Sequence, residues 1–325
     1  MRYIVYGVGA IGGTFAGALM QAGFPVIGIA RGAMLAAIAR DGLLFRTPAG
    51  DARIKLPVVG APSEINFAAD DVILLTTKSQ DTAAAVLALR DAGVTQQAVI
   101  CAQNGVANER AALRLFPNVY GMTVMMPSDY TVPGEVICYG EPKHGLLDLG
   151  RYPGGSDAVV DTVAAELDTA GFAVAPTAEV MRSKYGKLFE NLGNVIEAAL
   201  GPGVRAAEAQ ALARAEAKLA LRAAGITDWL DVSRDNARRA GVMELGTVAG
   251  AKRSGGSSAQ SLRRGAGSIE TDYLNGEIVL LGRLHGVATP VNAALCGIGR
   301  ELVSAGVQPG SLTVAALNQR LGIVV

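Results

Sequence analysis

The feature that most constrains the fold of this chain is a glycine-rich segment near its start, Gly7-Val8-Gly9-Ala10-Ile11-Gly12. An apolar run typical of a short buried strand, Tyr3–Tyr6, precedes it, and an alanine-rich stretch typical of a helix, Thr14–Ala22, follows it. In such a unit the first glycine allows a tight turn, the second lets the backbone approach a pyrophosphate, and the third lets helix pack on strand. Because the first helical turn also offers unpaired N–H groups to a phosphate, the segment predicts a dinucleotide-binding turn. Its expected ligand residues are Gly7, Gly9, Ala10, Ile11 and Gly12.

The first half of the chain repeats this alternation of strand and helix. Further β-rich runs lie at Val26–Ile29, Val72–Thr76, Ala98–Cys101 and Tyr120–Met125. The alternation predicts parallel βαβ units, and hence an α/β Rossmann domain with a mostly parallel sheet over residues 1–177. Its last part is expected to hold short antiparallel strands within Glu135–Leu149 at the sheet edge, a turn at Arg151–Ser156, a helix at Asp157–Ala170 and a strand at Ala173–Ala175.

Beyond Thr177 strand signals almost vanish and long segments with a 3.6-residue apolar period take over. Helices are expected at Val180–Leu200, Val204–Ala224 and Ile269–Leu284. The Gly/Ser-rich stretch Ala249–Ser268 is interpreted as a loop between two helices. We therefore expect an all-α second domain over residues 178–325, and a length of 325 residues suits two domains.

Composition narrows the range of partners. Lys and Arg together number 29, as do Asp and Glu, and charged residues make up 18%, so the balance encodes no general attraction to nucleic acid. No apolar run reaches the ~18 residues of a membrane span, and the glycine-broken start lacks the pattern of a signal peptide. The spacing of Cys101, Cys138 and Cys296 and the presence of only two histidines disfavour a metal site. We expect a cytoplasmic protein whose partners are a small molecule and a second subunit.

The residue after the second predicted strand bears on the type of dinucleotide. A fold that prefers NAD places an acid there for the ribose 2′-hydroxyl, whereas this chain has Arg31. A guanidinium at that point can hold a 2′-phosphate through charge-assisted hydrogen bonds, so Arg31 favours NADP(H). The alternative is a solvated surface arginine.

Two more polar residues follow later predicted strands. Lys78 comes after Val72–Thr76, and Asn104 comes after Ala98–Cys101. Ligands of open α/β sheets gather at the carboxyl ends of the strands. Lys78 is therefore a candidate cofactor residue, and Asn104 a candidate for cofactor ribose or substrate. The alternatives are an exposed lysine and an ordinary Asn-Gly turn.

A series of short motifs runs along nearly the whole chain: GVGAIGG at 7–13, Arg31, TTK at 76–78, QNG at 103–105, KLFEN at 187–191, SIETDYLNG at 268–276 and TPVN at 289–292. In this order they resemble the ketopantoate reductase family. The resemblance implies an NADPH-dependent reduction of 2-dehydropantoate or a related 2-keto acid. It also implies a Rossmann domain followed by a helical domain that forms homodimers.

The helical period supports a polar site within Val180–Leu200. At 100° per residue Lys187, Asn191 and Asn194 fall on one line, beside the apolar line of Leu188 and Leu192. Such groups at the border of a core can bind a polar ligand. The alternative is the solvated edge of an amphipathic helix.

Reduction of a ketone needs a hydride at carbon, a proton at oxygen and positive charge near that oxygen. A lysine ammonium can supply the last two. By resemblance, Lys187 is the general acid, Asn191 binds the substrate, and Lys184 is structural. The matching family acid, Glu270, binds the substrate hydroxyl and pairs with the lysine, and Ser258 binds the substrate carboxylate. The helical period also places Glu270 with Leu281 and Leu284 on an apolar side of the predicted helix. The alternative is that Glu270 is an ordinary acid in the first helical turn after an N-cap at Ser268.

Two positions depart from the family pattern. Val195 stands where a second substrate-binding asparagine is common, with Asn194 one position earlier, and Leu262 stands where an acid often follows the serine. Both bear on the substrate, and Val195 favours a 2-keto acid without the 4-hydroxyl of ketopantoate. Two other functions are open: an opine- or imine-forming reductase of the same fold, and an NADPH sensor without activity.

Overall fold

The computed structural model describes residues 1–323, apart from the side chains of residues 232, 233 and 235. The chain divides into two compact units. Unit 1 comprises Met1–Gln103, Ala107–Lys184 and Asp231–Arg253, and unit 2 comprises Asn104–Val106, Tyr185–Leu230 and the chain from Ser254 onward. Domains of 1–177 and 178–325 stay a prediction, and residues 324–325 of the second lie outside the described residues.

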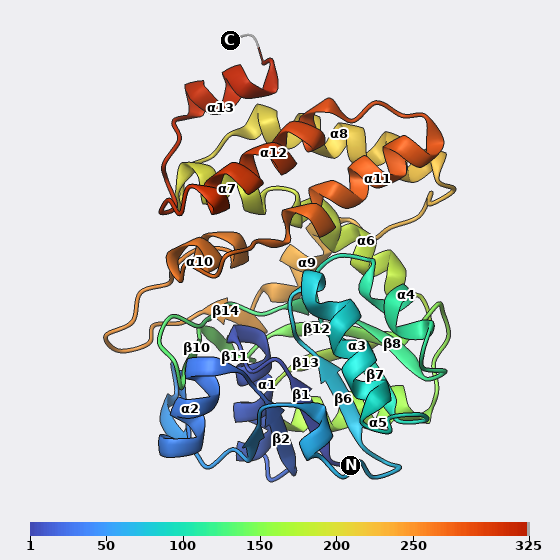
Figure 1. Cartoon of the computed structure of the whole chain (residues 1–325), viewed down its shortest axis with the longest axis vertical. Helices are drawn as coiled ribbons and strands as arrows, with labels where there is room; N and C mark the ends of the chain where they lie inside the picture. The colour runs from blue at the N-terminus through green and yellow to red at the C-terminus, as the bar shows by residue number, and fades with distance from the viewer. Residues whose placement is uncertain (324–325) are drawn as a thin grey trace. The chain divides into compact units, whose positions relative to one another are not determined.

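An eight-stranded sheet forms the centre of unit 1, in the order β13-β12-β8-β7-β6-β1-β2-β5 (Figure 1). Neighbouring strands are parallel except for the antiparallel pair β12 and β8. This confirms the mostly parallel α/β fold. The strands are β1 (Tyr3–Tyr6), β2 (Val26–Ile29), β5 (Val58–Val59), β6 (Val72–Leu75), β7 (Ala98–Cys101), β8 (Val119–Met125), β12 (Leu146–Arg151) and β13 (Ala173–Pro176).

Both faces of this sheet are buried because helices cover each of them. Tyr3 and Val5 of β1 join one apolar core, and Ile4 and Tyr6 join the other, as the alternation of a strand requires. The first core contains side chains of α1 (Ala10–Gln21) and α5 (Ala158–Thr169), and the second those of α3 (Thr82–Asp91) and α4 (Asn108–Leu113). The remaining helices of unit 1 are α2 (Gly32–Asp41), α9 (Val232–Arg239), η1 (Pro62–Glu64) and η2 (Ser79–Asp81).

The strands within Glu135–Leu149 are only partly as expected. Of these, β12 closes onto the main sheet antiparallel to β8, as predicted. However, β10 (Glu135–Cys138) pairs parallel with β3 in a second sheet, and β11 (Gly140–Pro142) pairs with a strand distant in sequence. The prediction was wrong here because pairing with distant strands leaves no mark in a local pattern. The partners of β10 are β3 (Leu43–Thr47) and β9 (Ser128–Asp129), and the partner of β11 is β14 (Met243–Leu245). Strand β4 (Gly50–Ile54) pairs with β3 at the edge of the second sheet.

Unit 2 is helical around one apolar core. Its helices are α6 (Val180–Asn191, from Tyr185 onward), α7 (Asn194–Leu200), α8 (Ala207–Ala223), α10 (Ser257–Arg263), η3 (Glu270–Tyr273), α11 (Asn275–His285), α12 (Pro290–Ser304) and α13 (Val314–Leu321). Within residues 1–323, no helix is long and apolar enough to cross a membrane.

Two helix predictions and one loop prediction in the second half were wrong in detail. The helix Val180–Leu200 is interrupted at Leu192-Gly193, where the Gly193 N–H donates to Glu190 O in a tighter turn. The helix Ile269–Leu284 is interrupted at Leu274, because Asn275 donates its side-chain N–H to Leu192 O and to Asn292 Oδ1.

The loop Ala249–Ser268 contains helix α10. This helix forms because Ala259 and Leu262 pack into the core of unit 2. Burial therefore outweighs the turn-like composition of the flanking Gly and Ser residues.

Candidate functional site

The glycine-rich turn lies at the carboxyl ends of parallel strands in unit 1, where ligands of open α/β sheets bind. At Gly7 the backbone φ is +107°, and a Cβ would lie 2.8 Å from Thr77 N. Thr76 Oγ1 donates to Tyr6 O at 3.0 Å and Gly7 O at 2.9 Å, which fixes this turn. Only glycine fits at position 7.

Gly12 and Gly9, the other two glycines of the motif, differ in how much space surrounds them. At Gly12 a Cβ would lie 2.3 Å from Gly7 O and 2.5 Å from Thr76 Oγ1, so this glycine allows the helix to approach the strand. At Gly9 a Cβ would meet no atom of the described chain within 4 Å. Gly9 is the N-cap of α1, so the N–H groups of Ala10 and Ile11 in the first helical turn face an approach that is open beside it.

Arg31 and Lys78 follow other strands at the same edge of the sheet. Arg31 is exposed at the N-cap of α2, and its Nη2 lies 3.5 Å from Tyr6 Oη. Lys78 is half-buried directly before η2. Both residues thus come from loops next to the glycine-rich turn.

In unit 2, the residues expected to bind substrate include buried polar atoms that remain unpaired. Asn191 is 6% exposed and Ser258 is 2% exposed. Asn191 Oδ1 and Ser258 Oγ have no hydrogen-bond partner among residues 1–323. Leaving such an atom unpaired costs about 1–3 kcal/mol, so a polar ligand that satisfies it gains that free energy.

Lys187 forms an ion pair with Glu190, a residue that was not among the predicted site residues. Its Nζ donates to Glu190 Oε2 at 2.5 Å, and the side chains are 19% and 25% exposed. The spacing of three residues within α6 is a recognisable sign of such a pair. Glu190 therefore fixes the ammonium group, and the lysine side chain as a whole stays partly accessible.

Glu270 is buried, but not as part of the predicted helix Ile269–Leu284. It lies in the short turn η3 and is 3% exposed, whereas Leu284 of α11 is 66% exposed. The sequence placed Glu270 and Leu284 on one side of a single helix. That prediction was wrong because the helix is interrupted at Leu274, between the two residues. Ser268 is not the N-cap either, since Ile269 occupies that position.

The break after α6 also changes the polar stripe. Lys187 and Asn191 stay one turn apart on α6, but Asn194 is the half-buried first residue of α7. Asn104 is half-buried in the loop after β7 and belongs to unit 2. Val195 and Leu262 are buried in the apolar core of unit 2.

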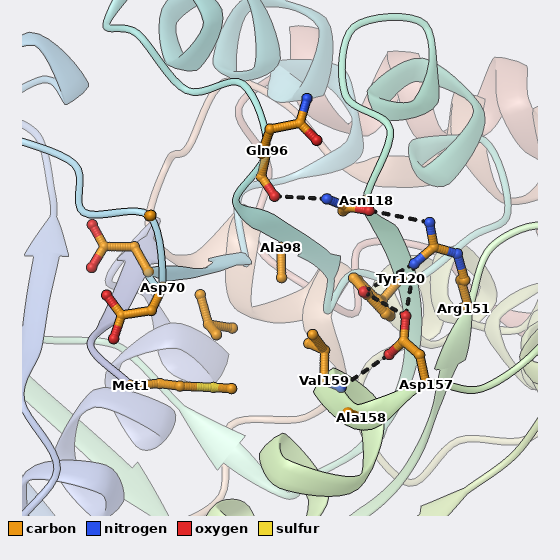
Figure 2. A pocket seen from close by; sticks show the side chains of 13 residues that line it. Met1, Asp70, Gln96, Ala98, Asn118, Tyr120, Arg151, Asp157, Ala158 and Val159 are labelled. Atoms are coloured by element: carbon orange, nitrogen blue, oxygen red, sulfur yellow. Dashed lines mark hydrogen bonds and ion pairs between the residues drawn. The ribbon is translucent and has the colours of Figure 1, made fainter.

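A cavity of about 290 Å³ lies in unit 1, but at the opposite edge of the sheet from the glycine-rich turn. Figure 2 shows Arg151 bonded to Asn118, Tyr120 and Asp157 on one wall of this cavity. Burial and the hydrogen bond to Asp157 raise the pKa of Tyr120 to about 12. Because this cavity lies away from the glycine-rich turn, it is not the candidate site.

Two family models match this chain. One, described as ketopantoate reductase PanE/ApbA, matches residues 3–154, and the other, described as the C-terminal part of the same reductase, matches residues 170–302. A curated relative named 2-dehydropantoate 2-reductase from Halobacterium salinarum is 27% identical over 92% of this chain and 98% of its own length. The relative of that name from Pyrococcus horikoshii is 26% identical over 94% of this chain and 99% of its own length.

Solved structures show the same likeness. A PanE/ApbA family ketopantoate reductase from Ralstonia eutropha has a TM-score of 0.76 at 28% identity, covering 94% of this chain and 99% of its own. A D-mandelate dehydrogenase in a ternary structure with NADH and anilino(oxo)acetate has a TM-score of 0.77 at 26% identity. The match covers 98% of this chain and 100% of the dehydrogenase chain.

Proposed function

Because this chain belongs to the ketopantoate reductase family, we propose that it uses NADPH to reduce 2-dehydropantoate or a related 2-keto acid to the 2-hydroxy acid. The observations that carry the proposal are an open dinucleotide turn at Gly9 in unit 1 and, in unit 2, buried polar atoms without a partner at Asn191 and Ser258. NADPH, when bound, supplies the hydride. The protein's own residues hold the pyrophosphate, orient the keto acid and deliver the proton.

In this proposal Lys187 is the general acid. Its ammonium group donates a proton to the ketone oxygen as negative charge develops there, and it stabilises that charge before the transfer. Glu190 holds Nζ at 2.5 Å, which limits the conformations the lysine explores. Asn191, Asn194, Ser258 and Asn104 are proposed to bind the substrate, and Glu270 its hydroxyl and the cofactor.

The cofactor preference is assigned to Arg31. We expect Arg31→Ala to raise the Kd for NADPH about tenfold, the effect of one lost charge-assisted hydrogen bond, and to leave the Kd for NADH unchanged. Isothermal titration with both cofactors measures this. Arg40→Ala is the control, because Arg40 of α2 is also exposed but pairs with Asp41. An equal loss for both cofactors would show that Arg31 does not select the 2′-phosphate.

We propose that Val195 weakens the preference for ketopantoate, because it lies in the apolar core of unit 2 and brings no group that could bond a substrate hydroxyl. A site built to bond a hydroxyl discriminates by 10⁴–10⁵, whereas an apolar site tolerates its absence. We therefore expect kcat/KM for 2-ketoisovalerate to lie within about 100-fold of that for ketopantoate, although Glu270 is proposed to bind the substrate hydroxyl. Steady-state rates on both, beside phenylglyoxylate, the keto acid of mandelate, measure the order. A preference for ketopantoate above about 100-fold would contradict this assignment.

We also propose a homodimer formed by unit 2. Leu212 and Leu219 of α8 and Leu280 and Leu284 of α11 are 39–66% exposed, and the two helices pack on each other. The double variant Leu219→Glu/Leu284→Glu should halve the mass measured by light scattering after gel filtration. The control Leu87→Glu changes an exposed leucine on α3 of unit 1, and this variant should stay dimeric. A wild-type monomer would refute the proposal. The three buried, free cysteines suit the reducing cytoplasm in which we place it.

A further inference from the structure

Unit 1 contains a buried ion pair that the proposed reaction does not use. Lys184 is 2% exposed and Glu109 is fully buried, and Lys184 Nζ donates to Glu109 Oε1. The same Nζ donates to the main-chain oxygen of Gln103 at 3.0 Å. Burial, more than the nearby carboxylate of Glu109, raises the pKa of the Cys101 thiol well above its ordinary value. An ion pair so well shielded from water gains little stability over apolar residues of the same size, so another role is needed to explain it.

A hydrogen-bond network extends from this pair to the loops that carry the candidate site. Gln103 Nε2 donates to Thr77 O at 2.9 Å and to Thr82 Oγ1 at 2.8 Å. Thr82 Oγ1 donates to Asn108 Oδ1 at 2.8 Å, and Asn108 Nδ2 donates to Ser79 Oγ at 3.2 Å. The network therefore joins the loop after β6, which carries Lys78, to the loop after β7.

The pair also lies where the chain leaves unit 1. Gln103 and Lys184 are the last residues of unit 1 at two crossings into unit 2, and the chain returns at Ala107, two residues before Glu109. Asn104 is the residue after Gln103. Lys187 follows Lys184 by less than one turn of the same continuous helix, α6.

We propose that Lys184 and Glu109 are positioning residues, which fix the starting points of the two segments that carry Asn104 and Lys187. A shift of Lys184 would be transmitted along α6 to Lys187, and a shift of the Gln103 carbonyl would move Asn104. Misplacement of a reacting group by about 1 Å can cost ~100-fold in rate. The inference rests on the proposed roles of Lys187 and Asn104.

The test is a double variant, Lys184→Met/Glu109→Gln, which removes both charges at nearly constant volume. We expect amide hydrogen exchange in residues 103–107 and 185–191 to become about tenfold faster, because the anchor of both segments is lost. We expect kcat to fall at least ~10-fold and the Kd for NADPH to change by less than kcat, because the glycine-rich turn keeps its own hydrogen bonds from Thr76 Oγ1. The matched control is Arg2→Met/Asp71→Asn, which removes another ion pair of unit 1. Arg2 precedes β1, and Asp71, whose carboxylate is buried, precedes β6. This control should leave exchange in both segments and kcat unchanged.

Exchange and turnover separate this inference from the proposed function. If the wild-type protein reduces no keto acid, the proposed function fails, and the exchange result still decides whether the pair fixes the two segments. Unchanged exchange in the double variant overturns the inference, and so does faster exchange with wild-type kcat in an active enzyme. If the double variant does not fold, Glu109→Asp keeps the charge and should show a smaller loss in the same direction. Wild-type exchange in Glu109→Asp would then overturn the inference.

Discussion

Replacing Lys187 with alanine should lower kcat by roughly 10²–10⁴-fold, the range that a positioned proton donor contributes. Both the proton for the ketone oxygen and the positive charge beside it disappear in this variant. The Kd for NADPH should stay within about twofold, because the glycine-rich turn lies in the other unit of the structure. Stopped-flow kinetics at saturating substrate and fluorescence titration of NADPH measure the two quantities.

The control for this variant is Lys218→Ala, which removes an exposed lysine of α8 in the same unit. Its turnover should be that of the wild type. Wild-type turnover by Lys187→Ala would mean that another group donates the proton. An NADPH sensor without activity would bind NADPH but show no turnover even as the wild type, so the same two measurements separate that alternative from a reductase.

The second large effect is expected at Gly9. In Gly9→Ala the added methyl group would occupy the open approach to the turn, and we expect the Kd for NADPH to rise about 10–100-fold. Its φ of −99° and ψ of −153° suit alanine, so the free energy of unfolding should be unchanged or higher by less than about 1 kcal/mol. Isothermal titration and denaturant unfolding measure both effects.

Gly12→Ala provides the contrast within the same turn. Its methyl group would lie 2.3 Å from Gly7 O, so we expect a loss of about 1–3 kcal/mol in unfolding free energy even without cofactor. Equal losses of stability in the two variants would mean that Gly9 is a structural glycine rather than part of the pyrophosphate site.

The parts of the fold that depend on local sequence could be predicted. The strands of the Rossmann domain are short apolar runs between glycine-rich turns, and β1, β2 and β7 begin and end at the predicted residues. The turn at Gly7–Gly12 was equally accessible, since Gly7 needs a positive φ and Gly12 lies against Gly7 O and Val5 within the strand-turn-helix unit. The antiparallel strand β12 was predicted from the short strand-like runs between Glu135 and Leu149.

What could not be predicted depends on contacts between distant residues. The helix Val180–Leu200 has an unbroken apolar period, yet it is interrupted where Asn275 reaches the Leu192 carbonyl. Sequence position likewise gives no sign that Lys184 pairs with Glu109, 75 residues away. The partner of Lys187 was accessible in principle, because Glu190 lies three residues further along the helix.

The most direct test of the proposed reaction follows the hydride itself. Wild-type protein would be incubated with a 2-keto acid and NADPH deuterated on the transferred face of nicotinamide C4, and the product would be examined by mass spectrometry and NMR. The proposal predicts a 2-hydroxy acid that carries deuterium at C2, formed in step with NADPH oxidation. A product that forms only when an amine is added, or no labelled product from any keto acid tested, would contradict it.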